Sequence, residues 1–127
     1  MEQRFYKCER CGQIIAIVKN TDIPVFCCGE EMKELLPGTT DAAVEKHVPV
    51  YEIKDGKVLV TVGSVEHPAT EEHHIEWIAL VTNRGIHFKH LKETDHPCAS
   101  FHLDSDEEVC CIYTFCNLHG LWKASEE

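Results

Sequence analysis

Four cysteines crowd the first 36 residues, and their spacing constrains that segment more than any other feature. Cys8 and Cys11 form a C-x-x-C pair, and the adjacent pair Cys27-Cys28 follows. A segment shorter than ~40 residues buries too little apolar surface to fold alone, so it needs a metal, disulfides or association. Four thiolates favour zinc or iron over magnesium or calcium. We therefore expect residues 1–36 to form a small domain stapled by a metal ion at these cysteines.

The rest of the chain begins at a cluster of turn residues, Pro37-Gly38-Thr39-Thr40, and all nine histidines lie beyond it. Proline and glycine are the strongest local interruptions of regular structure. This cluster predicts a boundary near residue 37, between a first domain of residues 1–36 and a second of residues 37–127.

The second domain has the composition of β-strands. Five segments are rich in valine, isoleucine, threonine and aromatic residues: Val48–Ile53, Lys57–Val62, Ile75–Thr82, Ile86–Leu91 and Val109–Phe115. Asp55-Gly56 predicts a hairpin turn between the first two, and Asn83-Arg84-Gly85 a similar break later. We find no amphipathic helical pattern of 11 residues or more. The sequence therefore predicts an all-β chain whose second domain is an antiparallel sandwich or barrel.

The charge balance excludes several classes of function. Twelve Lys and Arg against twenty-two Asp and Glu give a formal charge of −10. Sequence-independent binding of nucleic acid needs a basic surface, as does adsorption to anionic membranes. No apolar run approaches the ~20 residues that span a bilayer, and residues 1–8 are polar and have no apolar core typical of a signal peptide. We expect a cytoplasmic protein without a nucleic-acid or membrane partner, in which eight cysteines are better explained by metal binding than by disulfides.

Three later segments combine histidine with other metal-binding side chains. They are Glu45-Lys46-His47-Val48-Pro49-Val50, the stretch from Glu66-His67-Pro68 to His73-His74-Ile75-Glu76-Trp77-Ile78, and Cys116-Asn117-Leu118-His119-Gly120-Leu121-Trp122. The C-x-x-H pair of the last segment has a spacing suited to one metal ion. A single histidine is more often a surface or core residue than a ligand, so the three segments carry weight only together.

The motifs resemble those of a known family. The cysteine pattern of the first domain resembles desulforedoxin and the N-terminal part of the desulfoferrodoxins, and the three later segments resemble superoxide reductase, the catalytic domain of that family. The resemblance is to the two-iron desulfoferrodoxin class and covers essentially the whole chain. It implies a desulforedoxin-like domain, an immunoglobulin-like antiparallel β-sandwich and a homodimer.

The resemblance also implies two iron sites per chain. One is a ferric ion held by Cys8, Cys11, Cys27 and Cys28. The other is an iron that cycles between ferrous and ferric states, with His47, His67, His73 and His119 as equatorial imidazole ligands and Cys116 as the axial thiolate.

The implied activity is the one-electron reduction of superoxide to hydrogen peroxide, a detoxification reaction with electrons from a rubredoxin-type donor. Two residues beside His47 have implied roles. Lys46 attracts superoxide and helps to protonate the intermediate, and Glu45 closes onto the sixth coordination position of the ferric product.

Two other readings remain open from the residues alone. One is a zinc-stapled structural or binding module without redox activity, since the choice of iron over zinc rests on the resemblance. The other is an iron dioxygenase on a β-barrel, which commonly uses two histidines and one carboxylate. Several residues match no motif position and are expected to be ordinary side chains: His74, His87, His90, His96, His102, Cys98, Cys110 and Cys111.

Overall fold

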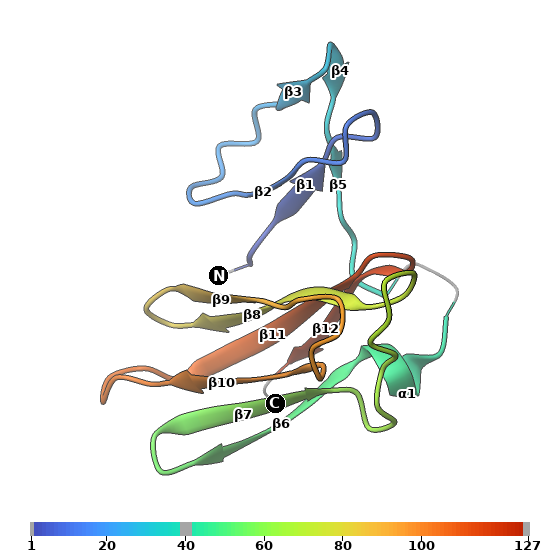
Figure 1. Ribbon diagram of the computed structural model, residues 1–127. Helices are drawn as coiled ribbons and strands as arrows, with labels where there is room; N and C mark the ends of the chain where they lie inside the picture. Colours follow the sequence, from blue (N-terminus) through green and yellow to red (C-terminus); the bar gives the residue numbers. More distant parts are fainter. Residues whose placement is uncertain (1, 39–41, 126–127) are drawn as a thin grey trace. The chain divides into compact units, whose positions relative to one another are not determined.

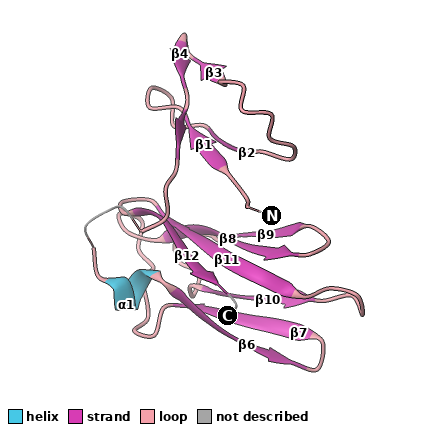
Figure 2. Ribbon diagram, turned by 180° about the vertical axis from the view of Figure 1, so that it is seen from behind, coloured by secondary structure: helices cyan, strands magenta, loops and turns pink. Residues whose placement is uncertain are grey.

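The computed structural model describes residues 2–38 and 42–125. The chain divides into two compact units, Met1–Leu36 and Pro37–Glu127 (Figure 1). Of the expected turn cluster, Thr39 and Thr40 lie outside the described residues. Figure 2 shows that the described chain is almost entirely strand and loop, with one short helix, which confirms the predicted all-β class.

The first unit is built from very short strands. β1 (Phe5–Lys7) lies between β2 (Ile14–Ala16) and β5 (Lys33–Glu34) in an antiparallel sheet, and β3 (Phe26–Cys27) pairs with β4 (Glu30–Glu31). Its buried hydrophobic residues in the described range are Phe5, Cys8 and Met32, whereas Val18, Ile23, Phe26 and Leu36 are exposed. So small a core leaves the fold dependent on another source of stability.

The second unit is a sandwich of two antiparallel sheets. One sheet has the order β10-β7-β6 and the other β12-β11-β8-β9 (Figure 1). The first contains β6 (Pro49–Lys54), β7 (Lys57–Val62) and β10 (Cys98–His102), and the second contains β8 (Ile75–Thr82), β9 (Ile86–His90), β11 (Val109–Cys116) and β12 (Gly120–Ser125).

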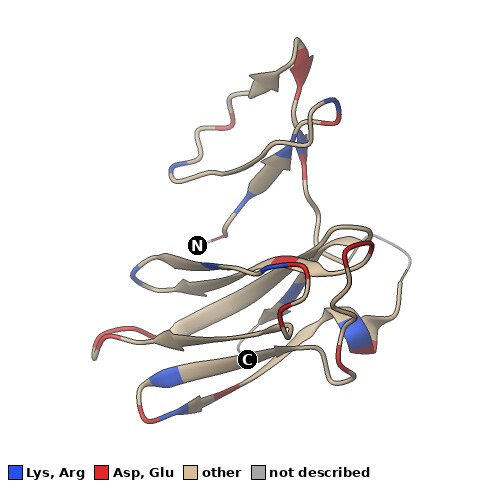
Figure 3. Cartoon of the chain, viewed as in Figure 1, with Lys and Arg blue, Asp and Glu red and all other residues tan. Residues whose placement is uncertain are grey.

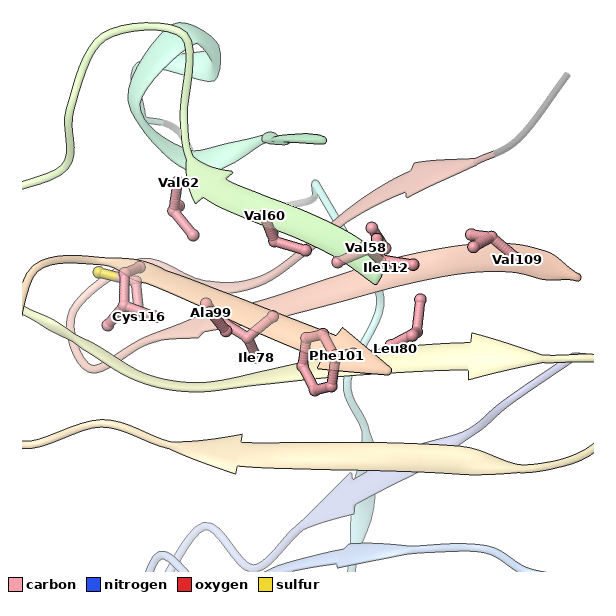
Figure 4. Packing of buried hydrophobic residues seen from close by; sticks show 11 residues of the cluster. Val58, Val60, Val62, Ile78, Leu80, Ala99, Phe101, Val109, Ile112 and Cys116 are labelled. Atoms are coloured by element: carbon pink, nitrogen blue, oxygen red, sulfur yellow. The ribbon is translucent and has the colours of Figure 1, made fainter. Parts of the chain in front are cut away.

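Alternating side chains of both sheets fill the core between them. On β7, Val58, Val60 and Val62 are buried, while the residues between them face outward. They meet Ile78 and Leu80 of the opposite sheet (Figure 4). Full burial of such a side chain contributes about 1.5–3 kcal/mol, so this layer holds the sandwich together.

The predicted strands and hairpins agree closely with the structure. All five predicted segments are strands, with ends that differ by one residue at most. Asp55 and Gly56 join β6 to β7 with φ angles of 52° and 74°, as a tight hairpin requires. Strands β10 and β12 were not predicted, because Cys98–His102 contains small and polar residues and β12 begins at a glycine.

The one helix, α1 (Val44–His47), is only four residues long, and contacts from elsewhere in the fold hold it. The Glu45 carbonyl accepts a hydrogen bond from the Val65 amide at 2.9 Å, and the His47 carbonyl accepts one from the Thr114 hydroxyl at 3.0 Å. Gly63 packs so closely that a Cβ there would lie 2.6 Å from the Glu45 oxygen. This helix is neither long nor apolar enough to cross a membrane, and the described residues contain no other helix.

Candidate metal centres

Four predicted ligands of the second unit converge from separate elements. His47 ends α1, His67 lies in the loop after β7, His73 lies just before β8, and Cys116 ends β11. Their potential ligand atoms all lie within 4.8 Å of one another. His47, His67 and Cys116 are buried, and His73 is partly buried.

Hydrogen bonds to backbone carbonyls fix the proton positions on two of these rings. Nδ1 of His47 donates to the Ala43 carbonyl at 2.7 Å, and Nδ1 of His67 donates to the Pro68 carbonyl at 2.8 Å. A carbonyl oxygen only accepts, so each neutral ring keeps an unprotonated Nε2. These two Nε2 atoms lie 3.2 Å apart, and two lone pairs at that distance need a cation between or beside them.

His73 and His119 complete the cluster. Nε2 of His73 is buried without a hydrogen-bond partner. Nδ1 of His119 lies 3.2 Å from Nε2 of His47 and 3.9 Å from Sγ of Cys116, and the His119 ring lies 5.0 Å from the His73 ring. A buried nitrogen without a partner and lone pairs that face one another are what a metal ion would satisfy. Imidazole and thiolate donors suit iron or zinc.

Burial controls the protonation of these groups. It lowers the pKa values of His47 and His73, and it lowers the pKa of His67 to about 4. The rings are therefore neutral at pH 7 and present lone pairs. Burial raises the pKa of Cys116, so its thiolate requires a nearby positive charge.

The four cysteines of the first unit also converge. Their sulfurs lie within 4.8 Å of one another, with 3.7 Å between Cys11 and Cys27 and 3.9 Å between Cys27 and Cys28. Bonds of ~2.3 Å from four sulfurs to one tetrahedral metal place the sulfurs about 3.8 Å apart. The separations therefore fit a single four-thiolate metal site.

The neighbouring cysteines reach the same site because the backbone turns between them. Adjacent residues on a regular strand point to opposite faces, which would keep the side chains of Cys27 and Cys28 from one metal ion. The structure places Cys27 at the end of β3 and Cys28 in the left-handed region, with a φ of 54°. The turn brings both sulfurs to one side, so alternation along a strand does not apply there.

Without a metal, the cysteines of the first unit share protons unevenly. A hydrogen bond from the Cys11 amide lowers the pKa of Cys8 to about 6, whereas hydrogen bonding to Cys8 raises the pKa of Cys27 to about 12. The first thiol ionises easily, and its negative charge makes ionisation of the next thiol less favourable. Four thiolates at this distance are therefore stable together only with a cation.

Comparison with known proteins covers both units. The family description Desulfoferrodoxin matches residues 39–125, and Desulfoferrodoxin, N-terminal domain, matches residues 1–35. A desulfoferrodoxin from Nitratidesulfovibrio vulgaris is 46% identical over 97% of this chain and 96% of its own length. The chain belongs to the desulfoferrodoxin family.

Solved structures related to this desulfoferrodoxin-family chain agree with that assignment. The superoxide reductase from Treponema pallidum is 38% identical, with a TM-score of 0.83, over 98% of this chain and 100% of that one. A superoxide reductase (1Fe-SOR) from Giardia intestinalis is 32% identical, with a TM-score of 0.51, over 65% of this chain and 98% of that one.

The two residues expected to act beside the family's catalytic iron lie on α1. Glu45 and Lys46 are both exposed, next to buried His47, and Figure 3 shows both charges on this helix. The pKa of His73 is lowered mainly by burial, then by the charges of neighbouring histidines. The positive charge of Lys46 makes a smaller contribution in the same direction. Lys46 thus places its positive charge close to candidate ligands from two segments.

Three of the histidines that match no motif position have hydrogen-bond or ion-pair partners elsewhere. His87 pairs with Glu107 at 3.0 Å, and His96 pairs with Glu66 at 2.7 Å. Nδ1 of His74 donates to the Thr70 carbonyl at 2.9 Å. Cys98 and Cys110 are exposed, and Cys111 is buried. None of these residues belongs to the two clusters of potential ligands in the described range.

Sequence reasoning missed the residues that support the ligands. The Trp122 ring stacks on the His47 ring at 4.9 Å, and its Nε1 donates to the His119 carbonyl at 3.0 Å. Trp122 ends the third histidine motif, three residues after His119, and this short spacing could have indicated a contact with the site. The carbonyls of Ala43 and Pro68 left no signal, because every residue carries one.

Proposed function

We propose that the protein is a superoxide reductase that converts superoxide, one electron and two protons into hydrogen peroxide. The observation that carries the proposal is the convergence of His47, His67, His73 and Cys116, with His119 beside them. Three separate segments supply nitrogen and sulfur atoms to one point. There, Nε2 of His73 is buried without a hydrogen-bond partner, and the Nε2 atoms of His47 and His67 face one another at 3.2 Å.

The five side chains hold the catalytic iron in this proposal. When bound, that iron supplies the one-electron reductant and an open coordination position for a small anion. The carbonyls of Ala43 and Pro68 orient two of the rings and keep their unprotonated nitrogens directed to the site. Trp122 packs over His47 and limits its movement.

Lys46 attracts the substrate. The chain carries a formal charge of −10, which opposes the approach of superoxide. Charges more than ~8–10 Å away are largely screened at physiological salt, so the field near the site depends on nearby charges such as that of exposed Lys46. Lys46 also supplies hydrogen bonding and acidity for one of the two proton transfers. Glu45, one residue away, would supply the carboxylate that closes the site around the oxidised iron.

The proposal gives the two units different tasks. Residues 37–127 form the catalytic domain, and residues 1–36 form a desulforedoxin-like domain whose four cysteines hold a second iron. The sulfur separations and the small core of that unit support this assignment. The family resemblance extends the proposal to a cytoplasmic homodimer that receives electrons from a rubredoxin-type donor.

Product stoichiometry under a flux of superoxide tests the activity. A reductase with an electron donor yields one peroxide for each superoxide and releases no oxygen. A dismutase divides the same superoxide equally between peroxide and oxygen. Release of oxygen in that proportion would overturn the proposal, as would a purified protein with two zinc ions and no consumption of superoxide.

A further inference from the structure

Asn117 joins the loop that contains His73 to the end of β11. Its side-chain Nδ2 donates to the Glu72 carbonyl at 3.0 Å, and its Oδ1 accepts from the His74 amide at 2.9 Å. Its own backbone amide donates to the His74 carbonyl at 3.1 Å. These three hydrogen bonds contact the residues on both sides of His73.

His73 depends on its backbone for orientation more than the neighbouring ligands do. The rings of His47 and His67 are held by hydrogen bonds from Nδ1 to carbonyls. Within residues 2–38 and 42–125, the His73 ring makes no hydrogen bond. Thr70 contacts the His73 backbone at 3.0–3.2 Å, but it lies in the same loop and does not fix that loop to the sheet.

We propose that Asn117 is a positioning residue that sets the place of His73 relative to Cys116. This inference rests on the proposed function, in which both residues are ligands of one iron. Asn117 directly follows Cys116 in sequence, so its hydrogen bonds connect the backbone of the thiolate ligand to the backbone of an imidazole ligand. A site whose ligands are held in place before binding has a higher metal affinity.

The chain contains a matched control for this arrangement at another pair of loops. Nδ2 of Asn83 donates to the Asp106 carbonyl at 3.1 Å, and its Oδ1 accepts from the Glu108 amide at 2.8 Å. Its backbone amide donates to the Glu108 carbonyl at 3.1 Å. The pattern is the same, but neither loop contains a proposed ligand.

The test compares Asn117→Asp with Asn83→Asp. Aspartate keeps the accepting oxygen but replaces the donating nitrogen with an oxygen that faces a carbonyl, so both variants lose the same hydrogen bond. Urea unfolding of the metal-free chain is expected to show a similar loss in both. Competition with a ferrous-iron chelator is expected to show ~10–100-fold weaker binding at the histidine site for Asn117→Asp. Asn83→Asp is expected to stay within about twofold of the unmodified protein.

The added negative charge of aspartate would by itself strengthen the binding of ferrous iron, because an anion attracts a nearby cation. Weaker binding in Asn117→Asp therefore reflects lost positioning. Cys11→Ser, which weakens the four-cysteine site, identifies which step of iron loss belongs to the histidine site. If the aspartate variants fail to fold, Asn117→Ala and Asn83→Ala provide the same comparison.

Equal iron affinity in the two matched variants would overturn the positioning role. If the unmodified protein reduces superoxide while the variants bind iron equally, the proposed function stands and this inference fails. If the affinities differ as expected but superoxide is not reduced, the inference stands and the proposed function fails.

Discussion

Single side chains determine how the histidine cluster is charged. Burial keeps His47, His67 and His73 neutral at pH 7, and carbonyl partners choose the protonated nitrogen in two of them. The positive charge beside the cluster comes from exposed Lys46. The candidate ligands thus present lone pairs to a cation, and Lys46 places a positive charge where the proposed function requires attraction of an anion.

Replacement of Lys46 tests electrostatic attraction directly. Lys46→Ala is expected to lower the second-order rate constant with superoxide by about tenfold at low ionic strength, because local positive charge raises association rates by 10–1000-fold. Its rate is also expected to depend less on ionic strength. Rapid-mixing or pulsed-superoxide kinetics would measure both. Lys54→Ala removes the same charge from the far end of β6, and equal kinetics in the two variants would contradict the role of Lys46.

A second residue-scale prediction concerns a carboxylate away from the metal site. The Asp104 amide, the His87 ring and the Thr82 hydroxyl lower the pKa of Glu107 from 4.5 to about 2. As pH falls, Glu107 therefore becomes protonated in the unfolded chain before it does so in the folded chain. The stabilisation from its ionised form is complete above about pH 4.5 and declines as pH falls toward 2.

We expect Glu107→Gln to lower the free energy of unfolding at pH 7, and the gap from the unmodified protein to shrink at pH 3. Urea unfolding of the metal-free chain at both values would measure it, with exposed Glu108→Gln as the control. A gap that is equal at the two pH values would show that ionisation of Glu107 contributes nothing.

At the scale of elements, the sequence predicted the strands and hairpins that follow from alternating residues and turn motifs. Alternating residues such as Val58, Val60 and Val62 identify strands, and Asp55-Gly56 identifies a hairpin. Helix α1 was not predicted, because four residues carry no helical periodicity and distant contacts hold the helix. The direction of Cys28 was also missed, because a left-handed backbone turn is not encoded by alternation.

The motifs located the candidate ligands better than the groups that support them. Histidine and cysteine are rare enough that their spacing is informative, as in Cys116-x-x-His119. The three hydrogen bonds of Asn117 connect residues more than 40 positions apart. Such connections depend on the register of β8 and β11, which the sequence does not specify by itself.

The close packing of Gly63 against α1 gives a prediction at this scale. A Cβ at Gly63 would lie 2.6 Å from the Glu45 oxygen and 2.7 Å from the Val48 oxygen. Because these are backbone atoms, Gly63→Ala must displace the helix that contains Glu45 and Lys46. We expect a loss of about 1–3 kcal/mol in the free energy of unfolding and slower reaction with superoxide.

The control for Gly63→Ala is Gly85→Ala, since a Cβ at Gly85 meets no atom within 4 Å. Urea unfolding and superoxide kinetics of both variants complete the test. Normal stability and kinetics in Gly63→Ala would show that α1 does not depend on this contact.

At the scale of the whole molecule, the two units obtain stability differently. The second unit has a continuous core between two sheets, whereas the buried hydrophobic residues described in the first are Phe5, Cys8 and Met32. Metal binding in such a small domain contributes directly to its folding. We therefore expect the fold of the first unit to depend on a metal at its four cysteines.

Removal of metal is expected to unfold the first unit and to leave the second unit folded. Chelation should abolish hydrogen-exchange protection of the amides in β1, β2 and β5, while amides of β8 and β11 stay protected. Mass spectrometry of the loaded and metal-free chains would show the difference. Unchanged protection of β1 would mean that the first unit folds without its metal.

The proposed activity depends most on which atoms hold the catalytic iron. Metal analysis combined with X-ray absorption at the iron edge measures this directly, with Cys116→Ser and His73→Ala as variants that each remove one proposed ligand. We predict two irons per chain, one held by four sulfurs and one by four nitrogens and a single sulfur. Each variant should change the second iron alone. Two tetrahedral zinc ions, or an iron whose ligands are unaffected by both variants, would contradict the account.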